Sequence, residues 1–470
     1  MLNQVLRLSK KQYHLSYFET FKHDSKQVWK GINNLLSRNK SKNSQEIKLN
    51  INGRLISDPK PVANAFNNFF TSVAQNLVEK LTPSNKNFKD YLTDSNSDSF
   101  FVSPVTPSEV NRQLLNLNEG IAPDAYDIPV KLIKCVSDAL TIPLTNLINE
   151  SFQSGFYPSM LKFAKVVPIH KAKSTEELTH YRPISLLPIF NKIFEKLMHT
   201  RLISFLEKHN IIFEHQFGFQ KKKSTSLAIL DLYNQLVNAI ENKKFSCCIF
   251  LDLAKAFDTI DHSILLDKLE FYGIRGTAPN CFKSYLTDRT QKVSINGELS
   301  NSCKITSGVP QGSVLGPILF LLYINDMPLV SRLLKFHLFA DDTSIFFSDQ
   351  NLRNLENTVN HELTKVSDWL TANKLTLSVE KSNFLIITSK QQNLSYQVDL
   401  KINNKSIIQK DYIKYLGVIL DKNLNWKQHF QHVNMKISKG IGILAKMRHF
   451  VPAQILRNLY FAFIAPHVNY

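Results

Sequence analysis

The chain has 470 residues, 43% of them hydrophobic, which is enough apolar material for a sizeable core and excludes a disordered tail. Lysine and arginine total 57 against 39 acidic residues, so the net charge of +18 favours a polyanionic partner, nucleic acid before a membrane surface. The five cysteines show no Cys-x-x-Cys spacing, which argues against a zinc knuckle or a disulfide framework. No apolar run approaches the roughly twenty residues that span a bilayer, and a signal-peptide core is lacking. We therefore expect an intracellular protein of the nucleus or cytoplasm, without a membrane partner.

The positive charge is concentrated in three segments of the sequence. Residues 1–60 hold 12 basic and 4 acidic side chains, residues 161–223 hold 12 and 5, and residues 421–470 hold 7 and 1. The rest of the chain is therefore close to neutral. A polymer with many phosphates could contact all three basic segments, whereas any single lysine within them is read more simply as a solvated side chain.

The N-terminal hundred residues are predicted to be mostly helical. Apolar residues recur at helical spacing up to about residue 40. An Asn-Gly pair within Ile47–Ile56 predicts a hairpin, and a further helix begins at Asp58. Serine, asparagine, lysine and aspartate dominate Thr82–Ser99, which we interpret as a linker with a domain boundary near residue 100.

A basic hairpin is predicted in the next part of the chain. Lys165–Lys171 has the composition of a strand, and Pro168 within it indicates an edge strand because proline cannot donate to a ladder. The returning strand contains Arg182. Lys171 and Arg182 could therefore clamp phosphates, although an ordinary basic hairpin explains the pattern equally well.

A short aromatic and basic run, Gln216–Lys223, lies between two helices of good periodicity. Two phenylalanines beside three lysines would suit a nucleic-acid strand, through stacking and charge. A solvated turn is the plainer interpretation of this run.

Two further stretches have sequences that could form part of a functional site. Phe245–Leu251 is almost continuously apolar, as in a strand buried on both faces, and it ends at Asp252. Ser307–Pro317 is rich in glycine and precedes an apolar helix, so its backbone could approach an anionic ligand closely. No Gly-Lys-Ser/Thr follows these glycines, which argues against a P-loop.

Two adjacent carboxylates, Asp341 and Asp342, interrupt two apolar runs and are expected at the tight turn of a hairpin. An Asx-stabilised surface turn would explain them. If Asp252 joins them, three hard oxygen ligands would suit Mg²⁺ and a phosphoryl displacement. Downstream, a long helix over 352–370, further strands and a basic helix favour an α/β or α+β sheet over a helix bundle.

Six motifs occur in an order and spacing that resemble LINE-type, non-LTR retrotransposon reverse transcriptases of the jockey and chicken-repeat kind. Any one of the motifs is weak, and the six together are specific. They are Asp252–Asp258, Gly308–Ser313, Phe339–Asp342, Tyr181–Ser185, Gln216–Phe219 and Tyr415–Val418.

The resemblance implies an α+β fold, the right-hand polymerase, preceded by a mostly helical N-terminal extension. The expected parts are a basic helical extension and linker over 1–100, fingers over 101–245, a palm with an antiparallel sheet over 246–420 and a partial helical thumb over 421–470. The resemblance also implies a fragment of a larger polyprotein, because the usual preceding endonuclease is absent and the thumb looks short.

The resemblance further implies RNA-directed DNA synthesis by two-metal nucleotidyl transfer onto a primer 3′-hydroxyl, with an RNA template, a DNA primer and dNTPs as partners. Two Mg²⁺ ions, or Mn²⁺ in their place, would be held by Asp252, Asp341, Asp342 and the Leu253 carbonyl. Phe257 would block a ribose 2′-hydroxyl. The other implied nucleotide-binding residues are Lys171, Arg182, Gln311, Gly312 and Lys381. The implied primer-supporting residues are Tyr415, Leu416 and Gly417.

Two other hypotheses stay open at this stage. A non-catalytic nucleic-acid-binding relic would keep the positive charge without needing intact carboxylates. An RNA-making polymerase could use the same palm, although Phe257 argues against it.

Overall fold

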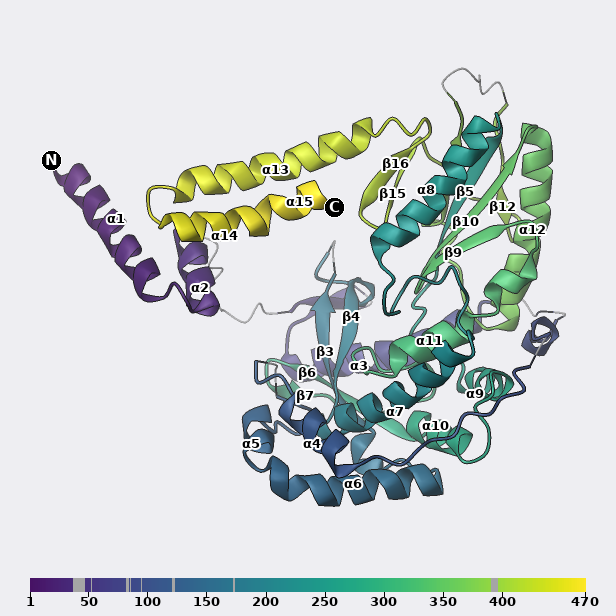
Figure 1. Ribbon diagram of the computed structural model, residues 1–470, viewed down its shortest axis with the longest axis horizontal. Helices are drawn as coiled ribbons and strands as arrows, with labels where there is room; N and C mark the ends of the chain where they lie inside the picture. Colours follow the sequence, from purple (N-terminus) through teal and green to yellow (C-terminus); the bar gives the residue numbers. More distant parts are fainter. Residues whose placement is uncertain are drawn as a thin grey trace. The chain divides into compact units, whose positions relative to one another are not determined.

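The computed structural model describes residues 1–36, 47–51, 53–81, 84, 86–93, 95–120, 123–171, 174–389 and 396–470 (Figure 1). The chain divides into two compact units: Glu46–Lys410, and a smaller unit of Met1–Gln45 with Asp411–Tyr470. Within its described residues, the larger unit combines many helices with two five-stranded sheets. The α+β prediction is therefore confirmed at this level.

The central sheet is built around a strand that is buried along most of its length. Residues 246–249 of this strand, β5, are all buried, as the continuous apolar run predicts. It pairs antiparallel with β10 on one side and β11 on the other, and β9 pairs with β10. The strand order is β14 (Ile408–Gln409), β11 (Asn383–Ile387), β5 (Phe245–Asp252), β10 (Asp342–Asp349) and β9 (Lys335–Phe339).

Two long helices contact this sheet: α8 (Thr225–Glu241) and α12 (Leu352–Ala372). Ser224 caps α8 by accepting a hydrogen bond from Leu227 N. On β9, His337 bonds to Gln235 of α8, while its neighbour Leu338 belongs to the core that includes α12. Because successive strand residues face opposite ways, the two helices cover opposite faces. Figure 1 shows α8 in front of the sheet.

The second sheet has the order β4–β3–β6–β7, with β8 also pairing with β6. The expectation that Lys165–Lys171 is an edge strand is wrong, because β3 lies between β4 and β6. Proline still avoids the ladder on this side, because β6 pairs only with residues 163–166 of β3 and Pro168 lies beyond these pairs. The strands are β3 (Phe163–His170), β4 (Tyr181–Leu186), β6 (Arg289–Ile295), β7 (Glu298–Leu299) and β8 (Cys303–Ile305).

Helices surround the core of the larger unit. Thr106 and Glu109 form a capping box at the start of α4. Most of these helices contribute residues to one extensive hydrophobic core that also contains the inner face of the central sheet. The helices are α4 (Pro107–Leu115), α5 (Val130–Cys135), α6 (Ser137–Ser154), α7 (Ile189–Lys208), α9 (His262–Phe271), α10 (Ala278–Leu286) and α11 (Gly316–Ile324).

The segment before α4 packs onto this unit. The predicted hairpin forms from β1 (Leu49–Ile51) and β2 (Arg54–Ile56), and helix α3 (Pro59–Val78) contacts β6 of the second sheet. Asn96 and Phe100 donate backbone hydrogen bonds to Phe271 and Gly273. The described residues of the predicted linker therefore run along the body of the unit. Short hairpin strands β12 (Lys401–Ile402) and β13 (Lys405–Ser406) complete this unit.

The smaller unit brings the two ends of the chain together. Phe18 and Ile32 from the N-terminal helices share a hydrophobic cluster with Met447 and Leu459 from the C-terminal helices. The sequence predicted these helices but left open what they pack against. The elements are α1 (Leu2–Thr20), α2 (Ser25–Leu35), β15 (Tyr412–Tyr415), β16 (Val418–Asp421), α13 (Lys427–Met447), α14 (Ala453–Phe463) and α15 (Ala465–Asn469).

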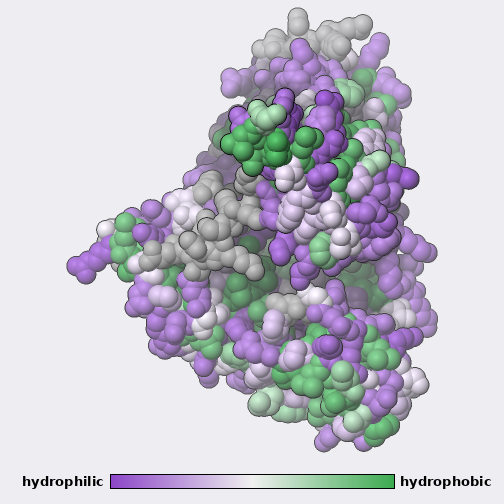
Figure 2. Space-filling model, turned by 90° about the vertical axis from the view of Figure 1, so that its left-hand side faces the viewer, coloured by the Kyte–Doolittle hydropathy of each residue, from purple (hydrophilic) through white to green (hydrophobic). Residues whose placement is uncertain are grey.

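The surface is mixed in character. Figure 2 shows a face on which hydrophilic side chains predominate and hydrophobic ones gather in separate patches. In the described part of the chain, no helix is both long enough and apolar enough to cross a membrane.

Candidate active site

Three aspartates meet at one end of the central sheet. Asp342 begins β10 and lies opposite Asp252, the last residue of β5, in the antiparallel register. Directly opposite residues project from the same face, with Cβ atoms about 4.5–5.5 Å apart. Asp341 lies in the turn between β9 and β10, so the predicted hairpin with an acidic turn is confirmed.

The acidic pair is held at an electrostatic cost. Burial raises the pKa of the Asp341 carboxyl, and the charge on Asp252 adds to the increase. Burial also raises the pKa of Asp342, and the charges of Asp341 and Asp252 add to it. Asp341 and Asp342 keep much of their surface exposed to solvent, so the three carboxylates repel one another at a place that a cation can reach, and a cation would relieve the repulsion.

The chemistry of these donors fits a hard divalent cation. Carboxylate oxygens are the ligands that Mg²⁺ prefers, and Mg²⁺ usually takes only one or two carboxylates beside water and substrate phosphates. Across the described residues, no group of three histidine, cysteine or acidic side chains is placed so that it could hold a metal ion by itself. A cation bound by these aspartates would therefore need further ligands from water or a substrate.

Cations lie within electrostatic range of the acidic pair. Arg182 on β4 and Lys171, just beyond β3, both oppose the increase in the pKa of Asp341. Lys171 also opposes it at Asp342. Lys171 N donates to His180 O at 2.8 Å, which closes the hairpin below its tip. Part of that tip, residues 172 and 173, lies outside the described residues.

A further cation, Lys255, was not singled out in the sequence. Its side chain is half-buried, Nζ donates to Tyr181 O at 3.3 Å, and the ammonium lies 5.6 Å from the centre of the Phe69 ring. Burial lowers the pKa of Lys255, and Lys171 and Arg182 add to the decrease. Three cations thus share one region. Lys255 falls inside the Asp252–Asp258 motif, which was the available signal.

Lys381 is an ion-pair partner of one aspartate. Its Nζ lies 3.5 Å from Asp252 Oδ2, with both side chains substantially exposed. The segment that carries Lys381 runs along the end of β5, because Ser378 N donates to Asp252 O. Leu253 is buried and forms an isolated bridge with Leu377 in the same segment.

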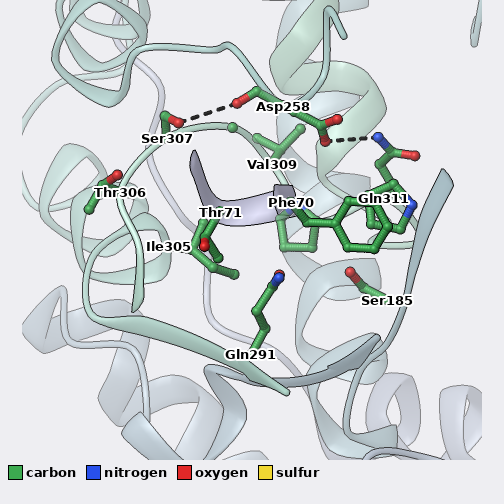
Figure 3. Close-up of a pocket in the computed structure, with 13 residues that line it drawn as sticks. Phe70, Thr71, Ser185, Asp258, Gln291, Ile305, Thr306, Ser307, Val309 and Gln311 are labelled. Carbon is green, nitrogen blue, oxygen red and sulfur yellow. Dashed lines mark hydrogen bonds between the residues drawn. The ribbon is translucent and has the colours of Figure 1, made fainter. Parts of the chain in front are cut away.

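The glycine-rich loop crosses β4 at close range. Ser185 N donates to Gln311 O at 2.8 Å, and Gly312 has φ +120°. A Cβ atom at Gly312 would lie 2.8 Å from Ser185 O, so only glycine permits this approach. Gln311 Nε2 donates to Asp258 Oδ1 at 2.8 Å beside a small pocket (Figure 3).

Asp258 and Phe257 both accept hydrogen bonds from the glycine-rich loop, Asp258 from Gln311 and Phe257 O from Val309 N. Burial raises the pKa of Asp258 to about 6, although the Gln311 hydrogen bond and Lys255 act in the opposite direction. The Phe257 ring stacks on Phe320 of α11 at 4.6 Å and meets Phe219 edge-on at 6.3 Å. The sequence missed Asp258 as a partner of Gln311, since that contact joins distant parts of the chain.

The acidic turn also has a partner that the sequence did not reveal. Gln216 Oε1 accepts a hydrogen bond from Ala340 N at 3.0 Å. From the sequence, the run that contains Gln216 suggested stacking on nucleic acid and binding by charge. The only sign of a contact between Gln216 and the acidic turn was that its run is one of the six motifs.

The predicted primer-supporting residues lie in the smaller unit. Tyr415 ends β15, and Leu416 and Gly417 form the turn to β16 with φ +43° and +97°. Tyr470 OH donates to Leu416 O, and the Tyr470 ring lies beside Gly417. Both contacts lie within the smaller unit.

A known protein family matches more than half of this chain. Residues 169–420 match the family described as "Reverse transcriptase (RNA-dependent DNA polymerase)", a region that includes the three aspartates, Lys171, Arg182 and the glycine-rich loop. The chain belongs to the reverse transcriptase family.

Its curated relatives narrow this class to mobile-element enzymes. The chain is 27% identical over 419 residues to "RNA-directed DNA polymerase from mobile element jockey" of Drosophila melanogaster, covering 84% of this chain and 45% of the relative. It is 29% identical over 382 residues to "Probable RNA-directed DNA polymerase from transposon X-element" of the same species, covering 78% and 41%. A BS transposon relative is 26% identical over 393 residues, covering 81% and 42%. The predicted resemblance to jockey-like, LINE-type reverse transcriptases is confirmed, and the chain spans less than half the length of these relatives.

Proposed function

We propose that this chain copies RNA into DNA by adding nucleotides to a primer 3′-hydroxyl at Asp252, Asp341 and Asp342. The observation that carries the proposal is the meeting of these three carboxylates at one end of the central sheet, within electrostatic range of Lys171 and Arg182. Acidic residues that could hold cations, together with basic residues nearby, suit a triphosphate whose charge must be neutralised.

Bound Mg²⁺ or Mn²⁺ would be held by the three aspartates and the Leu253 carbonyl, and would activate the hydroxyl and neutralise the departing pyrophosphate. The protein groups contribute positioning. Lys171, Arg182 and Lys255 would bind the triphosphate oxygens, and Gly312 would let the backbone approach the nucleotide. Lys381, already beside Asp252, would share in neutralising charge on the leaving group.

Gln311 and Phe257 would face the sugar of the incoming nucleotide. The Asp258 carboxylate can only accept hydrogen bonds, so it fixes the Gln311 amide with Nε2 inward and Oε1 free to meet a ligand. Phe320 and Phe219 hold the Phe257 ring, which would exclude a 2′-hydroxyl.

We further propose the right-hand division of the chain: an N-terminal extension over 1–100, fingers over 101–245, a palm over 246–420 and a partial thumb over 421–470. The antiparallel β5, β9 and β10 support the palm assignment, and the basic α13 supports the thumb assignment. Tyr415, Leu416 and Gly417 would support the primer end.

Primer extension tests the function. The purified chain should extend a DNA primer on an RNA template with Mg²⁺ and dNTPs, whereas Asp341→Asn should bind the same template–primer equally well without extending it. Binding without extension by the wild-type chain would contradict the proposal and favour the non-catalytic relic.

The preference for deoxyribonucleotides over ribonucleotides tests the proposed role of Phe257. Phe257→Ala should increase ribonucleotide incorporation at least about tenfold relative to dNTP incorporation, since removing the ring opens space at the 2′ position. An unchanged preference would argue against the role of Phe257.

A further inference from the structure

The segment Gln216–Gly218 extends the central sheet beyond β9. Phe217 N donates to Leu338 O at 2.7 Å, and Leu338 N donates to His215 O at 2.9 Å. Gln216 and Leu338 form a parallel bridge. The segment therefore covers part of the otherwise open edge of β9, immediately before the acidic turn.

The Gln216 side chain reaches the turn itself. Gln216 is 2% exposed, and its Oε1 accepts hydrogen bonds from Ala340 N at 3.0 Å and Gly218 N at 2.9 Å. Ala340 is also buried, so its N–H needs an acceptor within the protein. The amide of Gln216 is that acceptor.

The peptide that Gln216 holds has an unusual conformation. Ala340 has φ +54°, which is uncommon for a residue other than glycine and is maintained only by the surrounding structure. Gly218 packs against the same peptide, since a Cβ atom there would lie 2.4 Å from Ala340 N. One segment thus supplies both the acceptor and the close packing that this turn requires.

Asp341 follows Ala340 directly, so the orientation of its carboxylate depends on the Ala340 backbone. We propose that Gln216 is a positioning residue that fixes the acidic turn, and thereby sets the affinity of Asp341 and Asp342 for divalent cations. The inference rests on the proposed function. It also reinterprets this segment, for which the sequence suggested contact with nucleic acid.

The test removes the acceptor while keeping the volume of the side chain. Gln216→Met has no amide oxygen, Gln216→Asn keeps one that falls short of Ala340 N, and Gln216→Glu keeps an acceptor that reaches it. Gln235→Ala is the matched control, because Gln235 bonds to His337 on the same hairpin and does not contact the turn.

Two measurements are made on each full-length variant. The first is the Mg²⁺ concentration for half-maximal primer extension, with the KM for dNTP. The second is the rise in Tm on adding MnCl₂, which reports cation binding without activity. We expect Gln216→Met to raise the Mg²⁺ requirement about tenfold or more and to reduce the Mn²⁺-induced rise in Tm, with the KM for dNTP little changed. Gln216→Glu should show the Mg²⁺ requirement and the Mn²⁺-induced rise in Tm of the wild type. Gln235→Ala should lower only the Tm measured without metal.

The proposal is overturned if Gln216→Met and Gln235→Ala show the same Mg²⁺ requirement and the same Mn²⁺-induced shift. Should Gln216→Met fail to fold, Gln216→Asn is read by the same criteria. A wild-type chain that shows no extension would contradict the proposed function alone, because the Mn²⁺-induced shift still compares the variants.

Discussion

Asp341 illustrates how a residue that suits catalysis can reduce stability. Its folded-state pKa is raised, so the carboxyl favours folding when protonated at low pH, and this contribution is lost as the pH rises through the folded-state pKa. At pH 7 the charged group therefore lowers the free energy of unfolding. Asp341→Asn should raise the Tm in EDTA at pH 7 while reducing extension at least about 100-fold.

The comparison with Mg²⁺ completes this prediction. Bound cations relieve the repulsion among the three aspartates, so the Tm advantage of Asp341→Asn should shrink when Mg²⁺ is added. A variant that is less stable than the wild type in EDTA would show that Asp341 stabilises the fold, contrary to the electrostatic argument.

Asp258 is expected to set the acid limit of activity. Its pKa is raised to about 6, mainly by burial, so its carboxylate is lost as the pH falls through about 6. A protonated carboxyl can donate to the Gln311 amide oxygen and turn the amide around. We expect kcat/KM for dNTP to fall with an apparent pKa of about 6. Asp258→Asn has no titrating group at this position, so the decrease in kcat/KM at acid pH should be absent. If the decrease persists in this variant, another group is responsible for the titration.

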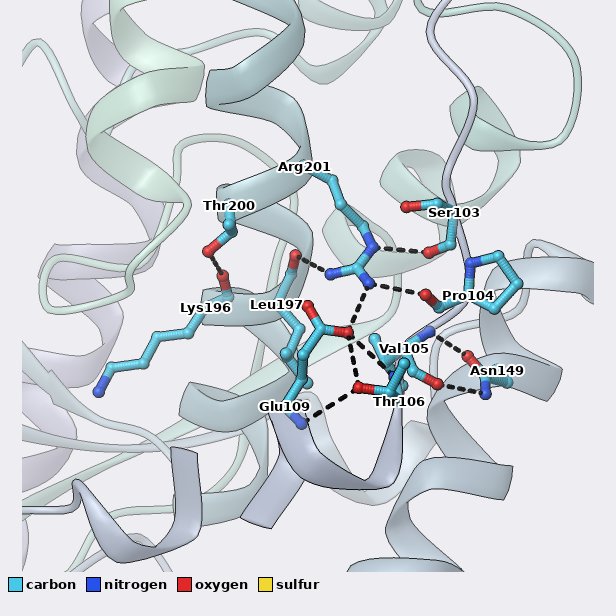
Figure 4. Close-up of polar contacts among 10 residues, drawn as sticks. All are labelled: Ser103, Pro104, Val105, Thr106, Glu109, Asn149, Lys196, Leu197, Thr200 and Arg201. Atoms are coloured by element: carbon cyan, nitrogen blue, oxygen red, sulfur yellow. Dashed lines mark hydrogen bonds and ion pairs between the residues drawn. The ribbon is translucent and has the colours of Figure 1, made fainter. Parts of the chain in front are cut away.

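At the level of elements, one arginine links helix α7 to the irregular segment before α4. The Arg201 guanidinium donates to Ser103 O, Pro104 O and Glu109 Oε2, at 2.6, 2.8 and 3.1 Å (Figure 4). Its side chain is only 9% exposed. Arg201→Ala would leave these acceptors without their partner, and we expect a loss of about 2–3 kcal/mol in the free energy of unfolding.

Lys196 provides the matched control on the same helix, because its ammonium points away from this cluster in Figure 4. Lys196→Ala should change the free energy of unfolding, measured in urea, by less than about 0.5 kcal/mol. Equal losses for the two variants would mean that the cluster contributes little. Extension at a temperature well below the Tm should be unaffected in both, since Arg201 belongs to the scaffold.

Local elements were the part of the fold that the sequence predicted well. The hairpin predicted within Ile47–Ile56 forms from β1 and β2, with Gly53 at φ +83° as an Asn-Gly turn requires, and the apolar run before Asp252 is a buried strand. Both depend on neighbouring residues. The position of β3 could not be predicted, because its parallel partner β6 lies far along the chain and nothing in either strand encodes the pairing.

In the site and in the whole molecule too, features set by neighbouring residues could be predicted and features set by distant residues could not. Asp252, Asp341 and Asp342 could be grouped because Asp252 ends a recognisable strand and the acidic pair lies at the turn of a recognisable hairpin. The contacts of Gln216 with Ala340 and of Asp258 with Gln311 depend on tertiary packing, so composition and periodicity gave no sign of them. The union of the two chain ends in the smaller unit depends likewise on apolar faces whose partners the sequence does not specify.

At the scale of the whole molecule, the net charge of +18 predicts salt-dependent binding of nucleic acid. Each phosphate that a lysine or arginine neutralises releases counterions, so log K should fall linearly with log salt. If six or more phosphates are contacted, affinity for a template–primer should fall about 1,000-fold between about 50 and 200 mM salt. Fluorescence anisotropy over a salt series measures this slope, and a flat series would exclude an electrostatic binding surface.

Where the charge acts can be tested with single substitutions of exposed lysines. Lys436 and Lys439 lie on the exposed part of α13, so Lys436→Gln and Lys439→Gln should each reduce the magnitude of the slope by about one. Lys365 of α12 is the control, because it pairs with Glu362 at 2.6 Å within the nearly neutral part of the chain. Lys365→Gln should leave the slope unchanged. If all three substitutions reduce it equally, binding follows the total charge, and the concentration of basic residues after residue 420 has no special role.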